Sequence, residues 1–213
     1  MKSEKRNVEE QHMVNYPLNL SFNLIALAPR IRVHDANGQE LLYVQQKTLA
    51  LKEDIRVFRD ESRTVELYRI RADRWLDFSA RYTITDSASG QTLGAIKHRG
   101  MRSIWKATYE FYDPNGTVTH VMTEDNPWVK VLDAFVSDIA IIGMFTGYFL
   151  NPTYTVHQGA EREGTGVLHM VKKPAFFESN FSIDKLGDNL GSEEERRLIL
   201  SILMAVQLER SRG

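Results

Sequence analysis

Cysteine is absent from this chain of 213 residues. The sequence therefore holds no disulfide, zinc–thiolate site, iron–sulfur cluster or thiol nucleophile. An excess of one charge is lacking too, because 27 basic side chains meet 28 acidic ones and the formal net charge is −1. We therefore expect no nucleic-acid partner, since domains that bind nucleic acid usually carry a clear basic excess.

The chain also lacks an apolar run long enough to cross a bilayer as a helix. Its two apolar stretches are 139–150 and 198–208. The second would extend about 16 Å as a helix, whereas the hydrocarbon core of a membrane measures about 30 Å. Residues 1–15 are polar and of mixed charge, without the apolar segment of a secretory signal. We expect these residues to form a flexible tail and the protein to be cytoplasmic.

Motifs that carry chemistry are missing as well. The sequence contains no P-loop, G-x-G-x-x-G, G-x-S-x-G or H-E-x-x-H pattern. Among the histidines, His98 could approach His120, and His157 could pair with His169, but neither pair has a third ligand nearby. We therefore predict no catalytic residues, no metal site and no cofactor, and a protein that is not an enzyme.

What the sequence does contain is a repeated hairpin. Four segments read as strand, turn and strand, and they span 31–47, 55–71, 82–98 and 109–125. Turn glycines fall at Gly38, Gly90 and Gly116, and position 64 completes a series with steps of 26 residues. Asp-Pro-Asn-Gly and Asn-Gly are strong turn sequences. The second strands share an apolar position that we expect to point inward, namely Val44, Ile70, Ile96 and Met122.

The remaining chain reads as more strands and two helices. An amphipathic helix is expected at 127–138, because apolar residues recur there with helical spacing. Further strands are expected at 140–149, 153–158, 166–172 and 176–184. Ser192 and Glu195 form a capping box that predicts a last helix at 192–210.

This last helix is apolar on every side, which indicates that the protein wraps around it. Closing the sheet would remove the unpaired strand edges that invite aggregation. A barrel of about twelve strands also has more interior than its own side chains fill. The sequence thus predicts a mainly β (α+β) fold, with residues 16–213 forming one closed antiparallel barrel around a hydrophobic C-terminal helix.

Four stretches of the chain resemble the LURP-one-related proteins, which are grouped with the tubby C-terminal domains and the phospholipid scramblases. These stretches are QQKTLALKEDIRVF (45–58), YTITDSASGQTLGAIKH (82–98), IIGMFTGYFLNPTYTV (141–156) and FSIDKLGDNLGSEEERRLILSILMAV (181–206). The resemblance covers about 30–210 and implies a twelve-stranded barrel around a C-terminal helix, as the residues themselves do.

The resemblance also implies membrane-related functions, since tubby domains bind phosphoinositides and scramblases act on membranes. This chain departs from the scramblases, because it lacks their palmitoylated cysteine cluster, their Pro-rich N-terminal region and an acidic calcium loop. The nearest candidate for that loop, 184–188, does not provide the alternating oxygen ligands of an EF-hand loop. Scramblase-like activity is therefore the least favoured alternative.

The best candidate site is a basic surface. If Ile70 and Ile96 point inward, the basic side chains next to them point outward. Neighbouring hairpins would then form one patch for phosphate head groups, with Trp75 or Trp105 inserted at the membrane interface. The candidate phosphate- or lipid-binding residues are Arg69, Arg71, Arg74, Lys97, Arg99, Arg102 and Lys106. The alternative is an ordinary charged exterior.

These observations predict a binding module of the tubby-like kind. It would be cytoplasmic, peripheral to the membrane where it binds, and would contact an anionic phospholipid through its basic face. The alternative is a scaffold or regulatory protein that binds another protein and has no small-molecule ligand.

Overall fold

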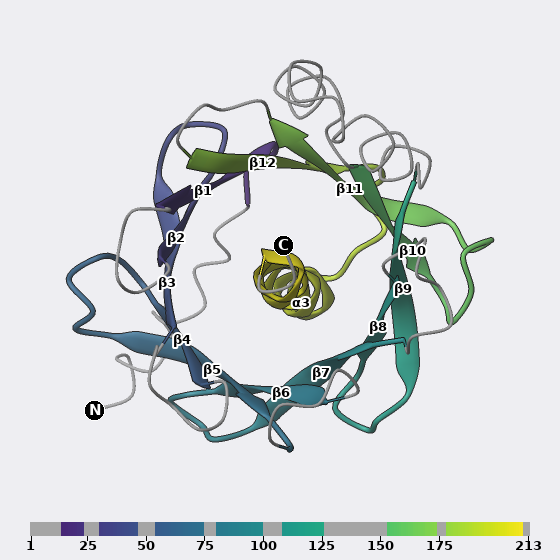
Figure 1. The fold of residues 1–213 in the computed structure, drawn as a ribbon, viewed down its shortest axis with the longest axis horizontal. Coiled ribbons are helices and arrows are strands. Elements are labelled where there is room, and N and C mark those ends of the chain that lie inside the picture. The colour runs from purple at the N-terminus through teal and green to yellow at the C-terminus, as the bar shows by residue number, and fades with distance from the viewer. Residues whose placement is uncertain are drawn as a thin grey trace, which may run out of the picture.

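The computed structural model confirms the predicted barrel and its central helix (Figure 1). The structure describes residues 14–23, 30–46, 54–74, 80–99, 108–125, 153–173 and 178–210. Twelve antiparallel strands of this described part form a closed ring, because β1 pairs with β12 on one side and with β2 on the other.

Sequence neighbours are also neighbours in the ring. The first six strands are β1 (Leu18–Asn23), β2 (Arg30–His34), β3 (Glu40–Gln46), β4 (Asp54–Phe58), β5 (Glu66–Ala72) and β6 (Arg81–Asp86). The other six are β7 (Thr92–His98), β8 (Thr108–Tyr112), β9 (Val118–Glu124), β10 (Thr153–Gln158), β11 (Gly166–Lys173) and β12 (Glu178–Lys185). The helix in the middle is α3 (Ser192–Arg210).

Aspartate side chains shape the hairpin turns. In the β2–β3 turn, Asp35 Oδ1 accepts hydrogen bonds from the backbone NH groups of Asn37 at 2.9 Å and Gln39 at 2.8 Å. The carboxylates that accept backbone NH groups in the next three hairpins are Asp60, Asp86 and Asp113. Such side-chain bonds stabilise a turn locally, which is why the repeat is readable in the sequence.

A β-bulge accompanies each of these turns. The register shifts by one residue beside the turn in β2–β3, β4–β5, β6–β7 and β8–β9, and again in β10–β11. The structure therefore extends the fourfold repeat of the sequence by a fifth hairpin. A hydrogen bond of 2.8 Å from Gln158 NH to Thr165 O closes its turn. Because this turn is longer than those of the other hairpins, the fifth hairpin does not follow the 26-residue spacing.

The second hairpin departs from the expected series. Gly38, Gly90 and Gly116 adopt the left-handed conformation with φ of 80°, 71° and 85°. In the β4–β5 turn that conformation belongs to Arg63, with φ of 57°, and not to position 64. The turn is longer here, as its closing hydrogen bond from Arg59 NH to Val65 O shows.

The helix α3 supplies the centre of the core. Its side chains from Leu198 to Leu208 are buried on all sides, including Ser201 and Gln207. The wall contributes the inward residues of each strand, among them Val44, Ile70, Ile96 and Met122, as the pattern predicted. The helix lies closest to β7 and also approaches β6 and β8. It meets β7 at Gly94, which has no side chain to collide with Arg197.

One strand was missed, and several expected elements lie outside the described residues. The strand β1 was not predicted, although Leu18, Leu20 and Phe22 alternate with polar residues and point inward. The expected helix at 127–138 and strand at 140–149 fall outside the described part. Of the expected tail, only Val14 and Asn15 are described, and Asn15 Nδ2 donates to Asp35 Oδ2 at 3.3 Å.

Candidate functional site

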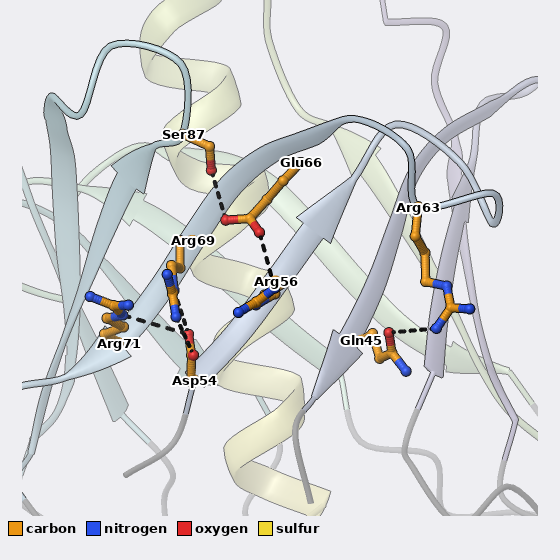
Figure 2. Close-up of polar contacts among 8 residues, drawn as sticks. All are labelled: Gln45, Asp54, Arg56, Arg63, Glu66, Arg69, Arg71 and Ser87. Carbon is orange, nitrogen blue, oxygen red and sulfur yellow. Dashed lines mark hydrogen bonds and ion pairs between the residues drawn. The ribbon is translucent and has the colours of Figure 1, made fainter. Parts of the chain in front are cut away.

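The strand β5 carries two arginines of the candidate surface on the outside of the barrel. Ile70 between them is 1% exposed and faces the core. Because side chains alternate along a strand, Arg69 and Arg71 point outward, as the sequence predicted. Figure 2 shows both side chains on the outer face, with α3 behind the sheet.

Both arginines are attached to one carboxylate of the neighbouring strand, Asp54. Arg69 donates to it twice, from Nε to Oδ1 at 2.7 Å and from Nη2 to Oδ2 at 2.5 Å. Arg71 Nε lies 3.6 Å from Oδ1 (Figure 2). The hydrogen bonds from Arg69, and the positive charges of Arg69, Arg71 and Arg56, lower the pKa of Asp54. Asp54 is therefore charged at neutral pH.

The structure adds Arg56, which was not among the predicted site residues. It pairs in register with Arg69 across β4 and β5. Its Nη1 lies 3.6 Å from Glu66 Oε2, and Ser87 Oγ donates to the other oxygen of Glu66 at 3.1 Å (Figure 2). The sequence did contain a signal for this position, because Ile55 and Val57 flank Arg56 and alternate with it.

A second group of candidates lies two strands away on β7. Lys97 pairs in register with Arg81 on one side and with Glu110 on the other. Arg99 follows β7, and its guanidinium lies 3.4 Å from Glu110 and 3.8 Å from Glu161. Arg99 is thus paired with two carboxylates, and Lys97 lies beside one of them in register.

The strand β6 separates the two groups. Thr83 pairs with Arg71 on one side and with Ala95 on the other, so neutral residues fill that row. In the next row Arg81 places its guanidinium 4.3 Å from the centre of the Tyr112 ring, a cation–π contact. The basic residues therefore occur as two groups, one centred on Asp54 and one on Glu110.

The remaining candidates contribute less to either group. Arg74 Nε lies 3.6 Å from Asp73 Oδ1, next to it in the chain. Arg102 and Lys106 lie outside the described residues, as do Trp75 and Trp105. The surface that the structure describes thus rests on Arg56, Arg69 and Arg71 with Asp54.

Four of the five histidines in the described ranges have separate environments. The His98 ring packs edge-on against Tyr109 with centroids 5.1 Å apart, whereas His120 faces α3 with Nε2 3.7 Å from Glu194 Oε1. His157 Nδ1 lies 3.0 Å from Gly164 O, and His169 Nε2 lies 3.4 Å from Asp125. Within the described ranges, no three acidic or histidine side chains come together as a metal site would require.

Comparison with known proteins identifies a family. The family model of the LURP-one-related proteins matches residues 40–206, which is more than half of the chain. No curated protein matches the sequence. No solved structure matches it either. In the part of the chain that the structure describes, no helix has the length and apolar character to span a membrane.

Proposed function

Because the chain belongs to the LURP-one-related family, we propose that it is a non-enzymatic cytoplasmic binding module of the tubby-like kind. In this proposal it contacts anionic phospholipid head groups through the outer face of β4 and β5. The protein would then be soluble until it docks on a membrane surface.

One observation carries the proposal. On the outer face a single carboxylate, Asp54, serves Arg69 and Arg71 and lies in the field of Arg56. The side chain of Arg71 is 58% exposed, so its terminal nitrogens remain open to solvent. Guanidinium groups bind phosphate oxygens through paired NH donors.

The test is vesicle sedimentation at two salt concentrations. We expect the wild-type protein to pellet with phosphatidylserine vesicles at low salt, and to be released at high salt because screening weakens exposed charges. The variant with Arg71→Glu and Lys97→Glu should lose this binding. It removes one cation from each group of the candidate surface.

A matched control is available on the opposite wall of the barrel. Arg162 lies in the β10–β11 turn and Lys173 at the end of β11, and both are exposed. The variant with Arg162→Glu and Lys173→Glu changes the net charge equally, so it should keep most of the binding. Absence of wild-type pelleting at low salt would remove the lipid proposal and favour a scaffold that binds another protein.

A further inference from the structure

The carboxylate of Asp54 lies among more positive charge than it neutralises. Arg69 donates hydrogen bonds to both of its oxygens, and Arg71 approaches one of them from the side (Figure 2). Arg56 is the third guanidinium group whose charge acts on this carboxylate. Asp54 thus lies in the field of three positive charges, of which Arg56 is also paired with Glu66.

The excess persists when the neighbouring strands are included. Arg30, Gln45, Arg56 and Arg69 form one row across β2 to β5, each in register with the next. Asp54 and Glu66 are the carboxylates that pair with the arginines of β4 and β5. In the described chain no carboxylate pairs with Arg30. Arg32 and Arg63 also lie on this face, and Glu40 and Glu61 pair with Arg32. Six arginines with four carboxylates leave an excess of two positive charges on this face.

The remaining donors suit a doubly charged phosphate. Arg71 engages Asp54 through Nε, which leaves its two terminal nitrogens for another acceptor. Arg56 contributes its positive charge to this face, because its Nε is buried and does not reach the surface. A phosphomonoester carries a charge of about −1.5 to −2 at neutral pH, which matches the excess, whereas a phosphodiester carries a single charge.

We propose that Arg56, Arg69 and Arg71 bind the phosphomonoester group of a ligand, and that Asp54 competes with this group for the same guanidinium donors. The inference rests on the proposed function and deepens it, because it names the ligand chemistry of the same face. The ligand takes over the paired donors of Arg69 that Asp54 occupies in the free protein.

The variant Asp54→Asn tests the competition, because it keeps the size of the side chain and removes its charge. We expect its affinity for vesicles that contain phosphatidic acid, a phosphomonoester lipid, to rise about tenfold, the equivalent of one lost charge-assisted hydrogen bond. The control is Glu163→Gln, which changes the net charge equally in the exposed β10–β11 turn. Its affinity should stay near that of the wild type.

Two further binding measurements identify the phosphate chemistry of the ligand and show whether it comes from a lipid or from a free phosphate. Phosphatidylserine vesicles, whose phosphate is a diester, should show a smaller gain with Asp54→Asn than phosphatidic acid vesicles do. Soluble glycerol 3-phosphate should displace the variant from phosphatidic acid vesicles if the free phosphomonoester is sufficient. If glycerol 3-phosphate does not displace the variant from the vesicles, the phosphomonoester must be part of a lipid head group in a bilayer. A gain of equal size on both vesicle types would overturn the phosphomonoester assignment.

The outcome can be separated from that of the proposed function. If the wild type pellets with phosphatidylserine but Asp54→Asn binds phosphatidic acid no tighter than Glu163→Gln, the competition is wrong and the lipid proposal stands. If the wild type does not pellet with phosphatidylserine but Asp54→Asn pellets with phosphatidic acid, general binding of anionic lipid by the wild type is ruled out and the competition for a phosphomonoester stands. Adding Arg71→Gln to Asp54→Asn should cancel the gain, and thermal melting should show that each variant is folded. If Asp54→Asn is unfolded, Asp54→Ser provides the same test.

Discussion

The Tyr109 hydroxyl donates a hydrogen bond of 2.6 Å to Glu209 Oε1, which ties the barrel wall to the last turn of α3. Tyr109 is fully buried on β8. At the other end of the helix, Lys185 Nζ lies 3.3 Å from Glu195 and His120 lies 3.7 Å from Glu194. An apolar helix could slide or rotate within an apolar sleeve. These polar contacts at both ends give it one axial position.

Removing the Tyr109 hydroxyl should therefore destabilise the barrel. We expect Tyr109→Phe to lower the free energy of unfolding by about 1–3 kcal/mol, because Glu209 loses a donor next to the core. Urea denaturation measures this value. The matched control is Tyr112→Phe, since Tyr112 donates to Glu110 at the same distance of 2.6 Å on the outer face. A similar loss in both variants would argue against a special role of the Tyr109 contact.

The central position of α3 makes a second prediction. Leu203 is 1% exposed in the middle of the helix. Leu203→Asp should abolish folding, because an ionised carboxylate in this apolar interior would have no partner. Leu203→Met keeps the volume and should cost less than about 1.5 kcal/mol. Circular dichroism and size-exclusion chromatography measure the outcome, and a soluble Asp variant that melts like the wild type would contradict it.

Much of this fold could be predicted because its signals are local. The turn of each hairpin is built by an aspartate and residues within a few positions of it, as Asp35 and Asp113 illustrate. The helix was recognisable because Leu198 to Leu208 cannot face water on any side. The strand β1 was missed because it lies outside the repeated hairpins, and its pairing with β12 at the far end of the chain is a long-range contact.

The site was harder to predict for a related reason. Alternation with Ile70 placed Arg69 and Arg71 outside, which needs no knowledge of the neighbours. The carboxylates that pair with the cations come from other strands, such as Asp54 for Arg71 and Glu110 for Arg99. Those pairings depend on register and on side-chain rotamers. A sequence pattern alone therefore suggested one basic patch, where the structure has two charge-paired groups.

The contact between α3 and β7 makes a third prediction. A Cβ added to Gly94 would lie 2.3 Å from Tyr112 O and 2.6 Å from Arg197 Cδ, and the φ of Gly94 is +156°. Gly94→Ala should therefore lower the free energy of unfolding by about 1–3 kcal/mol through overpacking. Gly187→Ala is the control, because nothing lies within 4 Å of its added Cβ. Chemical denaturation should show little change for that variant.

The strained turn of the second hairpin makes a fourth prediction. Arg63 adopts a left-handed φ of 57° while its Nη1 donates to Gln45 at 3.2 Å across the outer face (Figure 2). Arg63→Gly should be more stable than Arg63→Ala by about 1 kcal/mol, because glycine has no Cβ penalty in this conformation. Both variants lose the contact with Gln45, so their difference isolates the backbone. Equal thermal midpoints would refute the assignment of strain to Arg63.

The buried His120 makes stability depend on pH. Burial lowers its pKa from the ordinary value of 6.5, the charge of Arg197 lowers it further, and Glu194 opposes both. The unfolded chain therefore takes up a proton near pH 6.5, where the folded chain still holds a neutral ring. The stability that this ring contributes is present above that pH and is lost as the pH falls below it.

The variant His120→Gln removes this proton uptake and tests the sign. We expect the wild type to lose more stability than the variant when urea denaturation is repeated at a pH below 6.5. Carboxylates titrate in both proteins, so their contributions cancel in the comparison. A parallel loss in the two proteins would contradict the lowered pKa of His120. A wild type that gains stability in acid relative to the variant would show instead that Glu194 raises this pKa. In that second case the contact between β9 and the first turn of α3 would be an ion pair in acid, and Glu194→Gln should remove the gain.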